Sequence, residues 1–316
     1  MAISNATVHS THGQPPPSAS AAPPELRLIL SFDVEEHFRI EAAAKLAVEP
    51  SLLSHYGARL ESSTHWLLDI LEEFEQRATF FIVGQVARHQ PKLVRAIHQA
   101  GHEVASHSWD HRRVHRFTPA AFREDVRQSK DALEQVTGEA VRGYRAPTFS
   151  ILRETAWALD ELAELGLSYD SSIYPVRHDR YGVPDAPRWP FLARGETCSL
   201  LELPPATWRV LGTNLAVGGG GYFRLFPLAV MRRGLAQTMH QGQPPVAMLY
   251  FHPWEFDPEQ ERLPLSRLSR FRTYVGLPRS RGRLMTLFDQ HVFERAVDVA
   301  QALDSGSRLA EVSLPS

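Results

Sequence analysis

The sequence has a single cysteine, no long apolar run and no marked excess of either charge, and each shortage excludes a class of protein. Cys198 has no second cysteine to pair with, so no intrachain disulfide can form. No run of 18 or more apolar residues is present, so no membrane-spanning helix is predicted. The 34 basic and 36 acidic residues nearly cancel, which argues against a nucleic-acid partner bound by a broadly basic surface.

The chain has 316 residues and 43% hydrophobic content, enough for one large α/β domain or two smaller ones. Its first 24 residues are rich in Ala, Ser and Pro, and they lack the basic start and apolar core of a signal peptide. We therefore predict a disordered tail over residues 1–24 and a soluble, cytoplasmic protein. The sequence leaves the oligomeric state open.

Short apolar runs alternate with amphipathic stretches along the chain. Four runs have the composition of buried strands: 26–32, 78–84, 102–106 and 246–251. An apolar stripe predicts a helix from Ser62 or Ser63 to about Phe74, and a second helix follows Pro91 and ends at Gly101. This alternation predicts a parallel sheet, in which functional residues gather at the carboxyl ends of the strands.

Two clusters of possible metal ligands follow these predicted strands. Asp33 and Glu35 come directly after the first strand, and His107 and His111 come just past the third. At helical spacing, residues four apart share one face with Cβ atoms roughly 5–6 Å apart, which suits two imidazoles on one zinc ion. The alternatives are ordinary acids in a solvated loop and a pair of hydrogen-bonded histidines at a helix start.

Several segments, taken in order, resemble the polysaccharide deacetylases of the NodB homology type, carbohydrate esterase family 4. The order and spacing of these motifs agree from about residue 26 to residue 252. The segments are SFDVE (31–35), TFFIVG (79–84), HSWDH (107–111), RAP (145–147) and LYFH (249–252). The segments YDSS (169–172), RHDRYG (177–182) and HPWE (252–255) also resemble the subgroup encoded with exosortase and exopolysaccharide clusters.

The resemblance implies an α/β fold, a deformed (β/α) barrel of the NodB type, and metal-dependent removal of N-acetyl groups. Many members have two adjacent aspartates in the first motif, whereas Val34 follows Asp33 here. A branch of the family spaces its two acids by one residue, and that pattern makes Asp33 the base and Glu35 a metal ligand with His107 and His111. Zinc best suits the mixed nitrogen and oxygen ligands, and cobalt, nickel or manganese also fit.

The remaining motifs imply roles for groups around the metal. His252 would protonate the leaving amine, and Arg145 would hold the Asp33 carboxylate by a bidentate contact. The Thr148 backbone N–H would contribute to an oxyanion hole. Asp170 would orient His252, or cap the turn that follows it.

Candidate substrate contacts lie later in the chain. His178, Asp179 and Arg180 occupy a loop punctuated by Pro and Gly, which could contact sugar or be a salt-bridged loop, and Trp254 is a further candidate. The expected partner is an N-acetylated polysaccharide, an exopolysaccharide or its precursor. Two other interpretations stay open: a metal-dependent amidohydrolase acting on a small cyclic amide, and an inactive carbohydrate-binding domain. The retained acid–base pair argues against the second.

The predicted organisation is a catalytic domain over 25–255 and a subgroup extension over 256–316 packed on it. The glycine run at 218–221 lacks the Lys-Ser or Lys-Thr of a phosphate loop, so we predict a flexible turn there. The segment 262–283 is rich in arginine. It is predicted to be a solvated face, or alternatively a grip on an anionic polysaccharide or a phosphate-linked glycan carrier.

Overall fold

The computed structural model describes residues 25–46, 48–306 and 309–314, so the predicted tail over 1–24 lies outside the described residues. Its centre is a nine-stranded sheet of order β10-β1-β2-β3-β4-β5-β7-β6-β11. All neighbouring strands from β10 to β7 are parallel, which confirms the predicted parallel sheet. The strands are β1 Arg27–Val34, β2 Thr79–Ile82, β3 Glu103–Ser106, β4 Gly143–Tyr144, β5 Tyr169–Asp170, β6 Phe191–Arg194, β7 Ser199–Glu202, β10 Val246–Phe251 and β11 Glu311–Ser313.

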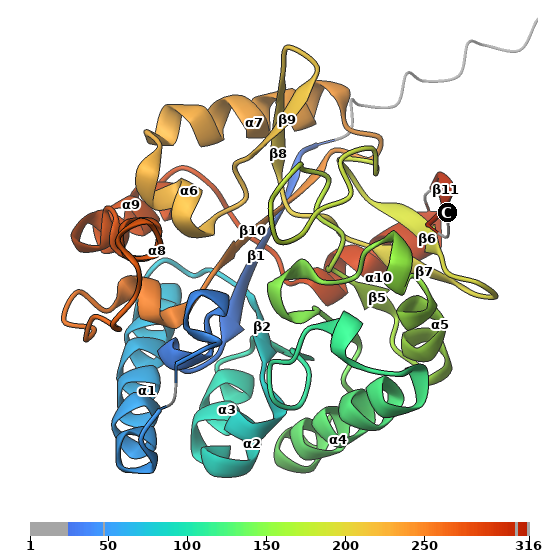
Figure 1. Ribbon diagram of the computed structural model, residues 1–316. Helices are drawn as coiled ribbons and strands as arrows, with labels where there is room; N and C mark the ends of the chain where they lie inside the picture. Colours follow the sequence, from blue (N-terminus) through green and yellow to red (C-terminus); the bar gives the residue numbers. More distant parts are fainter. Residues whose placement is uncertain (1–24, 47, 307–308, 315–316) are drawn as a thin grey trace, which may run out of the picture.

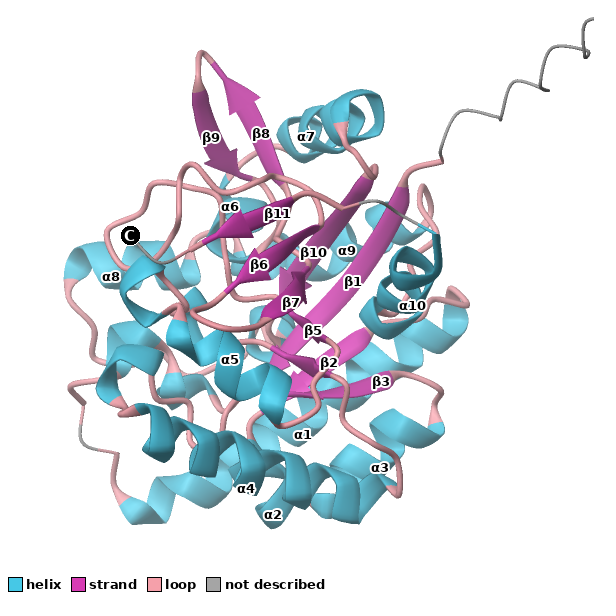
Figure 2. Ribbon diagram, turned by 90° about the vertical axis from the view of Figure 1, so that its right-hand side faces the viewer, coloured by secondary structure: helices cyan, strands magenta, loops and turns pink. Residues whose placement is uncertain are grey.

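Helices surround these strands. In Figure 1, α1 to α5 lie along the lower and right-hand sides of the sheet, and α6 to α9 lie at the upper left. The helices are α1 Pro50–Glu73, α2 Gly84–His89, α3 Pro91–Gln99, α4 Pro119–Thr137, α5 Trp157–Glu164, α6 Gly220–Leu225, α7 Leu228–Gln241, α8 Arg267–Tyr274, α9 Ser280–Phe288 and α10 Ala296–Gly306. A hairpin of β8 (Thr207–Val210) and β9 (Thr213–Ala216) projects beside α7 (Figure 2). Within the described part of the chain, no helix is long and apolar enough to cross a bilayer.

The central strands are buried on both faces, as their unbroken apolar sequences require. Phe32 on β1 is in register with Phe80 on β2 and with Phe251 on β10. The ring of Phe32 lies 5.1 Å from that of Phe80 and 6.2 Å from that of Phe251. The packing of these three rings stabilises the register of β10, β1 and β2. The residues that follow these strands therefore lie at the same edge of the sheet.

The chain after β7 returns to the free edge of β10. The Ala206 N–H donates to the Met248 carbonyl at 2.9 Å, and the Tyr250 N–H donates to the Gly218 carbonyl at 2.8 Å. Gly219 has φ +149°, and a Cβ at this position would lie 1.7 Å from the Tyr250 oxygen. Through these contacts, the segment that follows β7 packs against β10, which lies at the other end of the strand order, as a deformed barrel requires.

The glycine run at 218–221 is therefore a packing position at the edge of β10, and the prediction of a flexible turn was wrong. A second correction concerns α1, which begins at Pro50 rather than at Ser62 or Ser63. The Ser63 and Thr64 hydroxyls donate to the Leu60 carbonyl, at 3.1 and 2.7 Å, so they lie within the helix and do not cap it. The helix begins with Pro50, and proline is favoured at the first helical position because an N–H there would have no partner within the helix.

Candidate active site

Five of the parallel strands end at one site, and the first residue after each of them belongs to it. Parallel strands in register deliver their carboxyl ends to the same edge of a sheet, which is where α/β folds place functional side chains. The five residues are Glu35 after β1, His107 after β3, Arg145 after β4, Ser171 after β5 and His252 after β10. Asp33 lies within β1, two residues before Glu35.

Glu35, His107 and His111 form a ligand set whose atoms all lie within 4.8 Å of one another. The His107 Nδ1 lies 2.7 Å from the Arg145 carbonyl oxygen. Because a carbonyl only accepts, Nδ1 carries the hydrogen and Nε2 keeps its lone pair. The Glu35 Oε2 lies 2.6 Å from the His111 Nε2, yet it has no hydrogen-bond partner in the described part of the chain. A buried carboxylate oxygen without a hydrogen bond, together with the lone pair on the His107 Nε2, suits the binding of a divalent cation.

The ionisation states also suit a cation. Burial by itself would raise the pKa of Glu35, but the charges of His111, His252 and His107 lower it to about 2. Burial lowers the pKa of His107 to about 4, against the weaker effect of the nearby carboxylates. At neutral pH Glu35 is therefore an anion and His107 is neutral, and these are the forms that bind metal.

The two histidines meet in a loop, so the prediction that helical spacing brings them together was wrong. Ser108 and His111 have φ values of +68° and +65°, which turn the chain back on itself after β3. The Asp125 carboxylate on α4 accepts from the Ser108 hydroxyl at 2.7 Å and from the Trp109 N–H at 2.9 Å. A loop pinned to α4 thus sets the 5.1 Å separation of the His107 and His111 rings.

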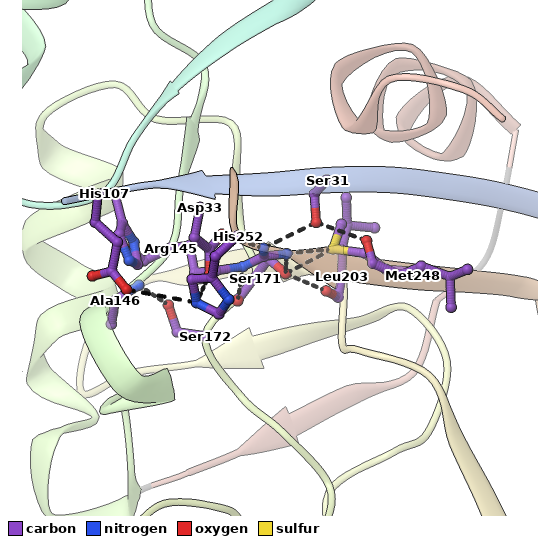
Figure 3. A network of polar contacts seen from close by, with 12 residues as sticks. Ser31, Asp33, His107, Arg145, Ala146, Ser171, Ser172, Leu203, Met248 and His252 are labelled. Atoms are coloured by element: carbon purple, nitrogen blue, oxygen red, sulfur yellow. Dashed lines mark hydrogen bonds and ion pairs between the residues drawn. The ribbon is translucent and has the colours of Figure 1, made fainter. Parts of the chain in front are cut away.

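Arg145 is fully buried and lies at the middle of a polar network (Figure 3). Its Nη1 donates to the Asp33 Oδ1 at 2.6 Å and to the Ser31 hydroxyl at 2.9 Å. Its Nη2 and Nε donate to the Ser171 hydroxyl and carbonyl, at 2.9 and 3.2 Å. The predicted bidentate contact is therefore wrong, because Ser171 uses the other two nitrogens. Arg145 fixes one oxygen of Asp33 and leaves the other facing His252.

His252 connects the two carboxylates to a second buried ion pair. Its Nε2 lies 3.9 Å from the Asp33 Oδ2 and 3.7 Å from the Glu35 Oε1. Its Nδ1 lies 2.8 Å from Glu255, whose other oxygen accepts from the Arg224 Nε at 2.7 Å. Burial alone would lower the pKa of His252, but the hydrogen bond and charge of Glu255, with the charges of Glu35 and Asp33, raise it to about 9. The imidazole is a cation at neutral pH.

Asp170 contacts the turn that follows it, in line with the second of its two predicted roles. Its Oδ1 accepts from the Ser172 hydroxyl at 2.5 Å, and it lies opposite Glu202 in the β5–β7 register. Burial raises the pKa of Asp170 to about 6 and raises that of Glu202 as well, so the two carboxyls share a proton. The group that holds the Nδ1 of His252 is Glu255, which corrects the expectation that Asp170 orients this histidine.

Trp254 also has a different place from the one predicted. It is buried, and its ring stacks on the His252 imidazole with centroids 5.4 Å apart and lies tilted against the His37 ring, with centroids 4.8 Å apart. The indole therefore supports His252 from within the fold. A direct contact between Trp254 and sugar would require this stack to open, so the substrate-binding assignment does not fit the structure.

The loop at 177–182 borders the site and is tied down by polar contacts. The Arg113 guanidinium donates to the Arg180 carbonyl, and the Asp179 carboxylate lies 3.7 Å from the Arg272 guanidinium. The His178 ring stacks on the Tyr181 ring with centroids 4.0 Å apart. The loop is salt-bridged, as one of the two interpretations held, and its part-exposed side chains still leave sugar contact open.

Thr148 and the next residue, Phe149, both have left-handed backbones, with φ values of +58° and +50°. Such conformations are costly for non-glycine residues and concentrate at functional sites. The Phe149 ring packs edge-on against Tyr250 at 4.8 Å and lies 5.6 Å from the Arg145 guanidinium. The strained turn is thus held in place directly beside the polar network.

Sequence reasoning missed two residues of this site, Glu255 and Arg224. Glu255 could have been found, because the HPWE segment places a carboxylate three residues after His252. Arg224 follows the glycine run and has no sequence signal that links it to a site. Its guanidinium is buried between Glu255 and the carbonyls of Thr273 and Val275.

Two family matches cover most of the described chain. Residues 53–169 match the polysaccharide deacetylase family, and residues 171–301 match a domain of unknown function, DUF3473. The first region holds His107 and Arg145, and the second holds His252 and Glu255. The site is therefore assembled from both regions together with β1.

Curated relatives include a chitooligosaccharide deacetylase from Bradyrhizobium, 35% identical over 57% of this chain and 64% of its own length. A peptidoglycan-N-acetylglucosamine deacetylase from Bacillus cereus is 27% identical over 30% of this chain and 35% of its own length. The chain thus spans between about one third and two thirds of the length of these relatives.

Solved structures share the fold at low identity. A probable polysaccharide deacetylase from Pseudomonas aeruginosa aligns with a TM-score of 0.58 and 18% identity over 89% of this chain and 91% of its own. The PuuE allantoinase aligns with a TM-score of 0.60 and 16% identity over 92% of this chain and 94% of its own. At this identity the likeness concerns the fold alone, and it agrees with the predicted deformed barrel.

Proposed function

We propose that this chain, which matches the polysaccharide deacetylase family over residues 53–169 and DUF3473 over residues 171–301, hydrolyses N-acetyl groups on sugar units of a polysaccharide. The observation that carries the proposal is the meeting of the Glu35, His107 and His111 ligand set with His252, whose Nε2 lies within 4 Å of both Asp33 and Glu35. Amide hydrolysis needs an activated water and an acid for the leaving amine, and this cluster offers groups for both.

Glu35, His107 and His111 would hold a divalent ion, for which zinc is the proposed identity. When bound, such an ion polarises a carbonyl and makes a coordinated water more acidic. The protein supplies the rest of the environment. Arg145 holds the Oδ1 of Asp33 at 2.6 Å, so the Oδ2 is directed to the site and can accept the proton of the attacking water.

His252 is the proposed general acid. The amine leaves as a neutral molecule only if it receives a proton, because an amide anion is a very poor leaving group. Glu255 holds the Nδ1 of His252 at 2.8 Å, which leaves the Nε2 proton directed to the side of Asp33 and Glu35. The raised pKa of His252, about 9, keeps this proton in place at neutral pH. Proton transfer from a positioned group of this kind contributes about 10²- to 10⁴-fold.

The substrate is proposed to be an N-acetylated exopolysaccharide or its precursor. The part-exposed His178 and Arg180 and the exposed Asp179 are the proposed sugar contacts, because the adjacent Tyr181 packs against Phe149, which lies beside Arg145. The Thr148 backbone N–H, held in its strained turn, is the proposed oxyanion donor. We also propose that residues 25–255 form the catalytic domain and that residues 256–316 are an extension of it. The proposed location of the protein is the cytoplasm.

The test is acetate release from N-acetylglucosamine oligomers and from the polysaccharide of the source cell, with metal restored after chelation. A small cyclic amide such as hydantoin is supplied in parallel, because the fold alone does not separate the two substrate classes. We expect acetate release that depends on metal and no turnover of the cyclic amide. Ring opening without acetate release would favour the amidohydrolase interpretation. No turnover of any substrate by metal-loaded protein would favour an inactive binding domain.

A further inference from the structure

Helix α8 presents apolar side chains to solvent. Leu268 and Phe271 lie three residues apart, on one face of the helix, and are 61% and 56% exposed. The buried residues of α8 are Thr273 and Tyr274, in its last turn. An exposed helix face normally carries polar residues, so an aromatic and an aliphatic side chain in this position require a partner or a function.

Arginines flank the apolar pair. Arg267 and Arg272 lie four residues from Phe271 and Leu268 respectively, so they share this face, and both are exposed. Among residues 25–46, 48–306 and 309–314, no carboxylate lies within 4.0 Å of a charged nitrogen of Arg267. Arg272 has Asp179 at 3.7 Å. The face is therefore apolar at its centre and positively charged at its borders.

We propose that the α8 face, defined by Arg267, Leu268, Phe271 and Arg272, docks onto the surface of an anionic phospholipid bilayer. Helices that bind bilayers in this way insert apolar side chains at the headgroup level while arginines contact the phosphates. An anionic polysaccharide would also attract the arginines, but it offers no apolar phase for Leu268. The combination of exposed apolar side chains with uncompensated charge on one helix face therefore favours a lipid surface.

The buried side of α8 connects this face to the active site. The Tyr274 hydroxyl lies 2.9 Å from the His37 Nε2, two residues after Glu35. The Thr273 carbonyl accepts from Arg224, which holds Glu255 and through it His252. Docking would therefore hold the opening of the site beside the headgroups, where a glycan attached to a lipid carrier extends from the bilayer. This last consequence rests on the proposed function, whereas the docking itself does not.

The experiment is co-sedimentation of the full-length, metal-loaded protein with vesicles of phosphatidylcholine alone or mixed with phosphatidylglycerol. We expect binding to the mixed vesicles that weakens with salt, and little binding to phosphatidylcholine alone. Arg267→Gln should lower the partition coefficient about fivefold. Leu268→Ser with Phe271→Ser should lower it at least tenfold at constant salt. Arg272 stays unchanged, because its partner Asp179 belongs to the loop at the opening.

The control changes an exposed leucine and an exposed arginine elsewhere: Leu211→Ser, at a residue 100% exposed against 61% for Leu268, and Arg88→Gln. The control should bind like wild type. All variants should retain acetate release from soluble oligomers, which shows that they fold. Docking is overturned if the control loses as much binding as the α8 variants. It is also overturned if the serine variants bind like wild type, or if hyaluronan, a soluble anionic polysaccharide, binds and the vesicles do not. Because sedimentation needs no turnover, a protein that binds vesicles but releases no acetate contradicts only the proposed function.

Discussion

The two halves of the site, the proposed metal ligands and the proposed general acid with its partners, differ in how their polar groups are hydrogen-bonded. On the ligand side, Glu35, His107 and His111 converge, and a buried oxygen of Glu35 has no hydrogen bond among the described residues. On the acid side, His252, Glu255 and Arg224 satisfy one another through contacts of 2.8 and 2.7 Å. The ligand side offers a buried carboxylate oxygen to the proposed cation, whereas the acid side is organised by contacts within the protein. Metal removal and mutation should therefore affect the two halves separately.

The largest effect should come from His107→Ala, which removes one of the three proposed metal ligands and leaves His252, Glu255 and Arg224 in place. A bound cation supplies several kcal/mol of transition-state stabilisation, so acetate release should fall on the order of 10³-fold or more. Metal content should fall with it, measured by elemental analysis after dialysis. The exposed His115 lies outside the ligand set, so His115→Ala should keep both metal and activity. Full metal content in His107→Ala would show that the ligand set is wrongly assigned.

His252→Asn should break the acid side while sparing the ligand side. Loss of a positioned proton donor lowers turnover by about 10²- to 10⁴-fold. Metal content should stay at the wild-type level, because His252 is not in the ligand set. Phenyl acetate is a useful second substrate, since its leaving group needs no proton. Activity on this ester should fall much less than on the amide, and equal losses on both would remove the general-acid role.

Glu255→Gln tests whether proton donation by His252 depends on the contact between Glu255 and the His252 Nδ1. Changes to groups that position a functional histidine cost about 10- to 100-fold. We expect a loss of this size in kcat with little change in KM. The alkaline limb of the pH profile should also move to lower pH, because the charge of Glu255 helps to raise the pKa of His252. The matched control is Glu259→Gln, whose side chain is 82% exposed. An unmoved alkaline limb would mean that Glu255 has only a structural role.

The smallest effect concerns stability. The pKa of His252 in the folded chain is about 9, above an ordinary value near 6.5. A raised histidine pKa stabilises the fold fully below pH 6.5, and the contribution disappears as pH rises through 9. In metal-free protein, the difference in unfolding free energy between wild type and Glu255→Gln should therefore shrink by on the order of 2 kcal/mol from pH 6 to pH 10. Urea unfolding at both pH values measures it, and a constant difference would contradict this electrostatic account.

The contrast between the two halves also explains what the sequence could predict. The ligand side lies in short motifs at strand ends, and strand ends are recognisable from apolar runs followed by acids or histidines. Even there, the loop that joins His107 and His111 depends on Asp125, a partner on another helix that no local pattern indicates. Spacing alone suggested a helix and was wrong.

The acid side depends on contacts that are distant in sequence. Arg224 lies 31 residues before Glu255, and Gly219 is required by its closeness to the Tyr250 carbonyl. Such pairings follow from three-dimensional packing, which composition and periodicity do not encode. The start of α1 was missed for a simpler reason, since Ser63 suits a helix cap and also an internal position where its hydroxyl bonds the preceding turn.

The pairing of β1 with β10 has a consequence for how the chain is made. The Ser31 hydroxyl donates to the Leu249 carbonyl across 218 residues of sequence. At ordinary translation rates of about 5–20 residues per second, β1 leaves the ribosome roughly 10 to 45 s before β10 exists. During that interval one apolar edge of β1 has no native neighbour and is exposed to chaperones and to other nascent chains. The strand that carries Asp33 is thus made first and gains its second neighbour only after most of the chain has been synthesised.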